Sequence, residues 1–264
     1  MEDNKKKGFS TFEKTGSYSL ERCWFSSDNQ TNADLVRFMR VDDPMKGLFV
    51  QNDPYKTVWS DLRKTEEEIL SGATKTIKYE VNKCLKEEVT VTFAPENNEN
   101  TFPLAILDEF EQSYIEFAKS LDNDELLKAY NRHRLEVLLQ DGHLLISKAE
   151  APGINVYHVY AWGGEASCLL FSVSNFRSDS SLRNLAGRMN KMLHIMDMRW
   201  LRENGVYWYD WGNISRSGQQ AGIDQFKVSF GGEVVDQYNV LRGMTLKGKF
   251  LVFGRKIKNV FFHG

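Results

Sequence analysis

The aromatic run Tyr207–Asn213 (YWYDWGN) is the feature that most constrains how this chain can fold. Four of its seven residues are aromatic, and Asp210 is the single charge among them. Aromatic residues favour strands, and a run that is apolar on both faces predicts a strand buried inside a sheet. The stretch Gly222–Glu233 then predicts a short helix that carries Lys227 and ends at two glycines. A strand end and a helix joined by a loop can form the floor of a substrate pocket, so this pairing indicates an enzyme.

Composition narrows the class of protein. The 264 residues allow one large α/β domain or two small ones. Apolar residues make up 41% of the chain and aromatic residues 12%, which suffices for a packed core and excludes bulk disorder. The net charge of −2 lacks the basic excess of proteins that bind nucleic acid over a broad face, although a local basic patch stays open. We therefore expect no DNA partner.

The cysteines and the chain start indicate the compartment. Cys23, Cys84 and Cys168 are far apart and match no metal-ligand spacing, so we expect ordinary thiols in a reducing compartment and neither metal nor thiol catalysis. The first residues are polar, and no apolar run approaches the ~20 residues that a membrane-spanning helix needs. These features predict a soluble cytoplasmic protein without a membrane span.

Helix and strand patterns organise the middle of the chain. Residues 1–55 show no clear period and are expected to form an N-terminal extension packed on a core domain of residues 56–264. Two short strands, Gly47–Val50 and Lys56–Ser60, are predicted on either side of a turn that contains Pro54. The sequence Thr65-Glu-Glu-Glu68 is a capping box, and it precedes an apolar stripe at four-residue steps that predicts one helix. The stripe comprises Ile69, Ala73, Ile77, Val81 and Leu85.

The second half predicts a strand-rich core. After a strand at Val89–Phe93, a polar loop at Pro95–Phe102 and helices up to about residue 134, three strands joined by turns indicate an antiparallel meander. A long helix, the aromatic strand, the short helix and a last strand follow. The predicted ranges are Gly142–Ala149, Asn155–Ala161 and Ser167–Val173 for the meander, Leu182–Glu203 for the long helix and Val234–Val240 for the last strand.

These residues carry a family resemblance. Tyr209-Asp210 with Gly212, then Gly222-Ile-Asp-Gln-Phe-Lys227 and Phe230-Gly-Gly-Glu233, resemble the C-terminal half of FemABX-type transferases, which have the GNAT (Gcn5-related N-acyltransferase) fold. The helix before the aromatic strand, with His194, and the basic helix Ile77–Lys83 are similar to helices of these proteins. The resemblance covers most of residues 56–240. It implies an α/β (α+β) fold with a mixed, mostly antiparallel sheet, helices on both faces, and acyl transfer.

Amide-forming acyl transfer needs a base for the amine proton, donors for the developing oxyanion and an anchor for phosphates. Asp210 is a candidate base, because partial burial raises the pKa of a carboxylate; alternatively it braces the Gly212 loop. Tyr209 can protonate the leaving group or fill the core, and His194 can relay a proton or serve as a core residue. Lys227 is a candidate phosphate anchor, or else a lysine that covers an aromatic pair with its stem.

Further contacts are predicted around these groups. Arg183 and Arg188 lie at the start of the long helix, where anions are favoured, and with Gly187 they are candidates for binding the phosphates of acyl-CoA; alternatively the arginines are surface residues. Lys78 and Tyr207 are further substrate-binding candidates, against the alternatives of a solvated helix face and a core tyrosine.

The resemblance thus implies an N-acyltransferase, and we expect it to move an acyl group, expected to be acetyl, from acyl-CoA to an amine. The expected acceptor is an amino sugar or a sugar nucleotide of surface-polysaccharide or cell-wall synthesis. The alternatives are an aminoacyl-tRNA-dependent Fem-type transferase and a non-catalytic GNAT-like binding protein. Fem-type enzymes carry two GNAT-like halves, and from the chain length we expect one half here.

Overall fold

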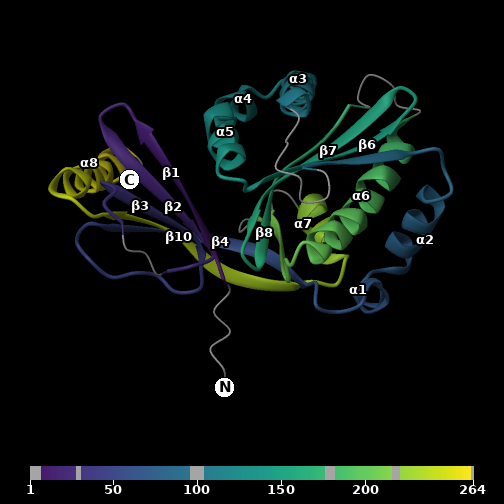
Figure 1. Cartoon of the computed structure of the whole chain (residues 1–264), viewed down its shortest axis with the longest axis horizontal. Coiled ribbons are helices and arrows are strands. Elements are labelled where there is room, and N and C mark those ends of the chain that lie inside the picture. Colours follow the sequence, from purple (N-terminus) through teal and green to yellow (C-terminus); the bar gives the residue numbers. More distant parts are fainter. Residues whose placement is uncertain (1–6, 28–30, 96–103, 176–181, 216–220, 263–264) are drawn as a thin grey trace.

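A ten-stranded sheet forms the centre of the molecule (Figure 1). The computed structural model describes residues 7–27, 31–95, 104–175, 182–215 and 221–262. The strand order is β1-β2-β3-β10-β4-β9-β8-β7-β6-β5, and neighbours are antiparallel except for two parallel pairs, β2 with β3 and β8 with β9. The predicted mixed, mostly antiparallel sheet is confirmed. The strands are β1 Phe9–Thr15, β2 Tyr18–Trp24, β3 Leu35–Val41, β4 Val50–Asp61, β5 Thr90–Ala94, β6 Leu144–Ala151, β7 Ile154–Gly163, β8 Ala166–Ser174, β9 Trp208–Asn213 and β10 Glu233–Gly243.

Helices cover both faces of the sheet, as predicted. One group packs on the face that carries Tyr160, Tyr209 and Trp211, and the other packs on the face that carries Tyr157 and Cys168. Adjacent strand residues such as Tyr209 and Asp210 therefore face opposite sides of the sheet. The first group is α1 Glu66–Gly72, α2 Lys75–Cys84, α6 Arg183–Glu203 and α7 Ala221–Val228; the second is α3 Leu104–Ser120, α4 Asp124–Ala129 and α5 Arg132–Gln140.

The meander, the long helix and the strands that follow lie close to their predicted positions. The turn at Ala151-Pro-Gly153 joins β6 to β7, and the long helix ends at Glu203, next to Gly205 with its φ of 80°. The Pro95–Phe102 loop lies almost wholly outside the described residues. The helix α8, Leu246–Phe262, was not predicted at all.

The prediction of one helix over residues 69–85 is wrong. The capping box at Thr65 is present, but the chain breaks at Ala73, and Thr74 caps a second helix by accepting from the Ile77 N–H at 3.4 Å. Two consecutive helices can show the same four-residue spacing of apolar residues as one long helix, so the stripe did not reveal the break. The available signal was Thr74, a helix-capping residue type that precedes Ile77 and Val81.

The predicted turn around Pro54 is also wrong, because β4 runs unbroken through it. Pro54 lies opposite Tyr238 of β10, while β9 pairs with β4 only from Thr57 to Asp61. Proline lacks a donor and is tolerated where one edge of a strand is not part of a ladder. The boundary predicted between residues 55 and 56 lies inside this same strand, and β3 joins the common sheet through β10.

Candidate active site

The parallel strands β8 and β9 form a fork. They pair over only three positions, from Ala166–Trp208 to Cys168–Asp210, and then separate. The β7–β8 register shifts at the same level, where Leu169 and Phe171 face partners on β7 and Leu170 is the extra residue. Such a bulge leaves a backbone unit outside the ladder and bends the strand. The fork therefore opens a gap in the sheet where backbone groups of β8 are free of strand pairing with β9.

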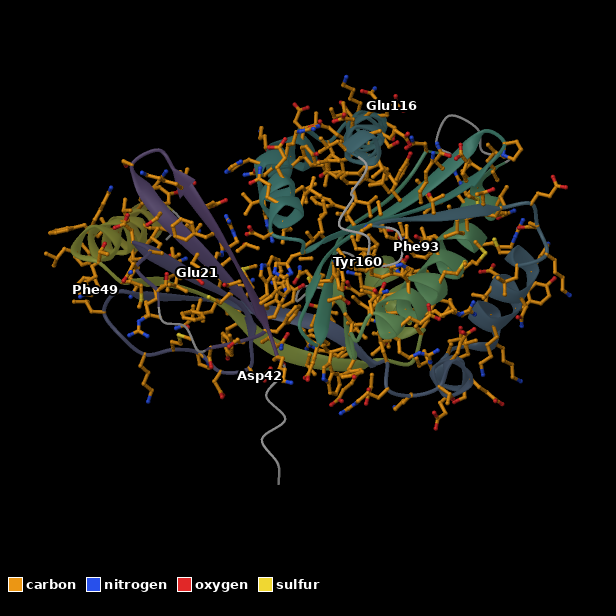
Figure 2. All side chains as sticks on the ribbon, viewed as in Figure 1. Glu21, Asp42, Phe49, Phe93, Glu116 and Tyr160 are labelled. Atoms are coloured by element: carbon orange, nitrogen blue, oxygen red, sulfur yellow. The ribbon has the colours of Figure 1, made fainter. Side chains whose placement is uncertain are left out.

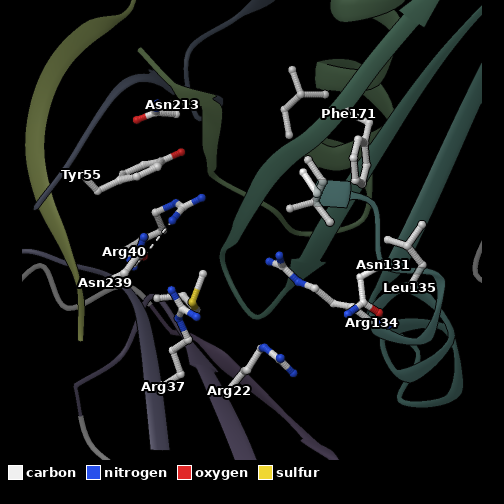
Figure 3. Close-up of a pocket in the computed structure, with 14 residues that line it drawn as sticks. Arg22, Arg37, Arg40, Tyr55, Asn131, Arg134, Leu135, Phe171, Asn213 and Asn239 are labelled. Atoms are coloured by element: carbon white, nitrogen blue, oxygen red, sulfur yellow. Dashed lines mark hydrogen bonds between the residues drawn. The ribbon is translucent and has the colours of Figure 1, made fainter. Parts of the chain in front are cut away.

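A pocket of about 350 Å³ lies at this fork. It is a size suited to one small polar ligand. Four arginines converge on it: Arg22 from β2, Arg37 and Arg40 from β3, and Arg134 from α5 (Figure 3). The remaining lining residues are Met39, Tyr55, Ala129, Asn131, Leu135, Leu169, Leu170, Phe171, Asn213 and Asn239.

Arg40 forms the floor of the pocket. Its Nε donates to Asp210 Oδ2 at 3.1 Å, its Nη1 donates to Asn239 Oδ1 at 2.7 Å, and its guanidinium stacks on the Tyr55 ring at 3.4 Å from the centroid. The backbone of Arg40 is left-handed, with φ of 64°, a conformation that a non-glycine residue keeps only when its surroundings fix it. Strain of this kind is concentrated at functional sites.

Asp210 is wholly buried beneath Arg40. Its Oδ1 accepts hydrogen bonds from the Thr57 hydroxyl and from the Gly212 N–H at 2.8 Å, and its Oδ2 accepts from Arg40. Three hydrogen bonds fix this carboxylate, and it in turn holds Arg40, Thr57 and the Gly212 backbone in place. Of the two predicted roles, base or brace of the Gly212 loop, this geometry matches the brace.

Among the described residues, no carboxylate forms an ion pair with Arg134. Its side chain lies 5.3 Å from the Trp24 ring centroid, and its Nε has no hydrogen-bond partner among the described residues. Burial, reinforced by the positive charges of Arg22 and Arg40, lowers the pKa of Arg134 to about 10. By contrast, Arg22 is paired with Glu13 at 2.8 Å and Arg37 with Asp53 at 3.8 Å. An anion placed among these groups would relieve the repulsion around Arg134.

Three further side chains lie next to the fork. The Tyr55 hydroxyl has no partner among the described residues, and burial together with the nearby Asp210 charge raises its pKa, so it stays a proton donor. Lys227 donates from Nζ to the Asn213 carbonyl at 2.7 Å and lies over Gly212, while burial lowers its pKa. Burial and the Asp210 charge raise the pKa of Cys168 to about 12, which keeps this thiol protonated.

Tyr209 and His194 lie on the opposite face of the sheet from the pocket. The Tyr209 hydroxyl is 2.7 Å from His194 Nδ1 and 2.7 Å from the Tyr160 hydroxyl, which donates to Asp197 Oδ2 at 2.6 Å. His158 Nδ1 contacts the same carboxylate oxygen at 2.6 Å. Figure 2 shows Tyr160 in the middle of the molecule, between the sheet and α6.

Hydrogen bonds within the protein account for the residues of this buried network. The potential metal-ligating atoms of His158, His194 and Asp197 lie within 4.8 Å of one another, but His158 uses both ring nitrogens, the second on Asn190 Oδ1 at 2.7 Å. The two histidine rings stack at 4.0 Å. Burial lowers the pKa of His194 well below its usual value and the nearby cations add to this, so the ring is neutral at neutral pH.

The other predicted site residues do not line the pocket. Arg183 is exposed at the start of α6, and Gly187 and Arg188 lie inside this helix, where Arg188 makes two hydrogen bonds to Glu87 at 2.6 and 3.1 Å. Lys78 donates to the Ser71 carbonyl at 3.2 Å on α1. Tyr207 precedes β9 and is partly exposed. Residues 183–188 therefore form the first turns of α6.

Sequence reasoning missed the four arginines, Tyr55 and Asn239. One signal was available: β3 reads Leu-Val-Arg-Phe-Met-Arg-Val, and two arginines in an apolar strand require buried partners or a ligand. Arg22 and Arg134 carried no such signal, because each belongs to a stretch that is polar for other reasons.

The chain matches no family model and no curated protein sequence. Solved structures do match. FemX superposes with a TM-score of 0.60 at 13% identity, over 99% of this chain and 88% of that one. The C-terminal domain of a putative lysylphosphatidylglycerol synthetase from Agrobacterium fabrum superposes with a TM-score of 0.51 at 9% identity, over 96% and 89%. L-PGS from Bacillus licheniformis superposes with a TM-score of 0.49 at 13% identity, over 95% and 88%.

The fold is FemABX/GNAT-like. The superposition on FemX confirms the fold that the resemblance implied. Because the likeness covers 88% of FemX, chain length no longer argues against a Fem-type transferase. No helix in the described part of the chain is long and apolar enough to cross a membrane.

Proposed function

We propose that this chain is an aminoacyl transferase that moves an aminoacyl group from aminoacyl-tRNA to an amine on a phosphate-bearing acceptor. The observation that carries the proposal is the arginine pocket at the fork, where Arg134 has no carboxylate partner in the described part of the chain. The acceptor that fits best is a sugar nucleotide or amino sugar phosphate of cell-wall or surface-polysaccharide synthesis. Its phosphate would occupy the space between Arg37, Arg40 and Arg134, since guanidinium groups bind phosphate oxygens through paired N–H donors.

The reaction joins the acceptor nitrogen to the donor carbonyl carbon and breaks the bond from that carbon to the ribose oxygen of the tRNA. The amine loses one proton and the departing oxygen gains one. Backbone groups around the Leu170 bulge supply donors for the carbonyl oxygen as it becomes negative. Lys227 and the Tyr55 hydroxyl add a cation and a proton donor beside the fork.

The donor assignment has two supports. FemX and a putative lysylphosphatidylglycerol synthetase domain superpose on nearly the whole chain. The name of the second protein denotes an aminoacylated product. In addition, Arg183, Gly187 and Arg188, which were predicted to bind the phosphates of acyl-CoA, lie in α6 and do not line the pocket.

Acyl-CoA is the second candidate donor, because the fork can also accommodate it. Two parallel strands that separate after three pairs leave a slot between Leu169 and Asn213 that suits an extended pantetheine arm as well as an aminoacyl ester. In this case the pocket arginines would bind the phosphates of the donor, because Arg183, Gly187 and Arg188 do not line the pocket. A non-catalytic binding protein would keep the phosphate site and transfer nothing.

Parallel labelling separates these functions. Labelled aminoacyl-tRNA and labelled acetyl-CoA are offered to the protein with a panel of UDP-amino sugars, and transfer of label is measured. We expect transfer from aminoacyl-tRNA; transfer from acetyl-CoA alone would replace the first proposal with the second, and transfer from neither would reject both.

A matched pair of arginine variants tests the site. In thermal shift assays a ligand at a hundred times its Kd adds about 2.7 kcal/mol to the free energy of unfolding. Arg134→Gln should abolish the shift given by the sugar nucleotide, whereas Arg183→Gln should leave it unchanged. A loss of acetyl-CoA binding in Arg134→Gln would instead support the acyl-CoA mode. An unchanged sugar-nucleotide shift in Arg134→Gln would show that the phosphate does not bind in this pocket.

A further inference from the structure

The helix α8 carries an apolar stripe that no described residue covers. Leu246, Phe250, Phe253 and Ile257 are 77%, 76%, 43% and 43% exposed. They are spaced at i, i+4, i+7 and i+11, which places them within about 60° of one another around the helix axis. Two large apolar side chains with about three quarters of their surface in water are unusual on a monomer.

The opposite face of α8 holds the helix on the sheet. Val252 is fully buried against Leu20, Leu35 and Leu241. A side chain on Gly248 would collide with the Asp34 carbonyl at 1.7 Å, so this glycine lets the helix lie directly on the chain beneath it. The stripe therefore points outward because the helix is fixed from its other side. Figure 1 shows α8 at one end of the long axis, far from α1 and α2, and Figure 2 shows its side chains projecting outward there.

Cations border the stripe on both sides. At 100° per residue, Lys247 and Lys258 lie on one side of the apolar stripe, and Lys249 and Lys256 lie on the other. The helix contains these four lysines and Arg255 and has no aspartate or glutamate. Lys256 also donates to the Leu48 carbonyl at 2.9 Å, which places another apolar side chain, 66% exposed, beside the stripe.

We propose that α8 docks this protein on an anionic lipid bilayer, lying in the plane of the membrane with the stripe inserted. An apolar stripe flanked by lysines, with no acidic residue on the helix, is the arrangement that binds an interface of acyl chains and negative headgroups. The long lysine stems reach outward to the headgroups while their methylenes cover apolar surface. Charge selects the occupant: a wholly basic helix complements anionic lipid, whereas a second copy of α8 would bring like charges together. This inference stands apart from the proposed reaction.

Vesicle sedimentation with the full chain tests the docking. The probes are vesicles of phosphatidylcholine with phosphatidylglycerol, and vesicles of phosphatidylcholine alone. We expect binding to the first and much weaker binding to the second. Phe250→Ser with Phe253→Ser should weaken partitioning by about tenfold for each phenylalanine. Lys247→Gln with Lys258→Gln should weaken it by about fivefold for each charge and reduce its salt dependence.

Phe12→Ser is the matched control, because Phe12 is a 56% exposed aromatic residue on β1 and not on α8. It should bind vesicles like the unaltered chain, and the melting temperature of each variant reports whether it is folded. No binding to the anionic vesicles would overturn the proposal, as would equal binding by the double phenylalanine variant. A dimer in sedimentation equilibrium that becomes monomeric in that variant would assign the stripe to a second copy instead.

Discussion

Replacing Asp210 with asparagine tests the brace beneath the pocket. The substitution keeps the shape of the side chain, and Oδ1 can still accept from Gly212 and Thr57. It removes the negative charge and places an N–H group opposite Arg40 Nε, which is now 3.1 Å from a carboxylate oxygen. Both side chains are buried, at 8% and 0% exposure. Removing one partner of a buried ion pair costs about 3–5 kcal/mol, because the other charge is left uncompensated.

The structure places this variant at the lower end of that range. Arg40 keeps its hydrogen bond to Asn239 and its stacking on Tyr55, so we expect a loss of about 3 kcal/mol. For a chain of this size each kcal/mol shifts the melting temperature by about 2–4 °C, which gives a drop of about 6–12 °C. Binding of the sugar nucleotide should also weaken, since Arg40 loses the group that orients it.

The assay is denaturant unfolding of Asp210→Asn, Arg40→Met and the double variant. We expect the double variant to be less destabilised than the sum of the single variants by about 2 kcal/mol. Asp61→Asn is the control, because it makes the same change in a surface pair with Arg63 and should cost less than about 1 kcal/mol. Additivity of the two single variants within about 0.5 kcal/mol would refute the reasoning, since it would show that Arg40 and Asp210 do not interact.

Three further outcomes are expected. Tyr55→Phe removes a buried hydroxyl that lacks a partner among the described residues, so stability should hold or rise by up to about 1 kcal/mol while transfer slows; a clear loss of stability would mean that the hydroxyl is bonded. Thr74→Ala should cost about 1 kcal/mol in chemical unfolding through loss of the α2 cap, with Thr76→Ala on the exposed side of α2 as the control. Burial lowers the pKa of His194 in the folded chain, so the unfolded chain binds one more proton at acid pH, and the free energy of unfolding should fall as the pH drops below the unfolded pKa of about 6.5. The slope approaches about 1.4 kcal/mol per pH unit, and His194→Gln should flatten it.

Local patterns predicted most of the fold. The β6–β7 hairpin, α6 and β9 follow from turn residues, helical periodicity and aromatic runs, all of which act over a few residues. The N-terminal strands were not predicted in this way, because their order in the sheet is set by partners that are distant in sequence. For example, β3 lies between β2 and β10, and Val36 faces Arg242. No local pattern encodes a pairing across two hundred residues.

The candidate site shows the same limit more strongly. Asp210 and Lys227 were predicted as members of the pocket wall, because a carboxylate at the end of an aromatic strand and a lysine before two glycines stand out in sequence. Arg40 and Arg134 come from elements that the chain brings together only through the sheet and α5. Their positive charges become neighbours only in the folded chain, so the sequence does not show that they are close together.

The residues that line the pocket restrict how the proton moves in the proposed reaction. Among those the structure describes there is neither an aspartate, a glutamate nor a histidine. Asp210 lies just beneath them, but its oxygens accept from Thr57, Gly212 and Arg40, so it has no geometry for receiving a proton from a ligand. A pocket that offers cations and hydroxyl donors stabilises negative charge on the carbonyl oxygen and on the departing oxygen. In the proposed reaction we therefore expect the acceptor amine to enter uncharged and to pass its proton to the leaving group, directly or through the substrate's own phosphate. This requirement suits an aminoacyl ester, whose departing ribose oxygen is a strong base, better than a thioester, whose departing sulfur is a weak one.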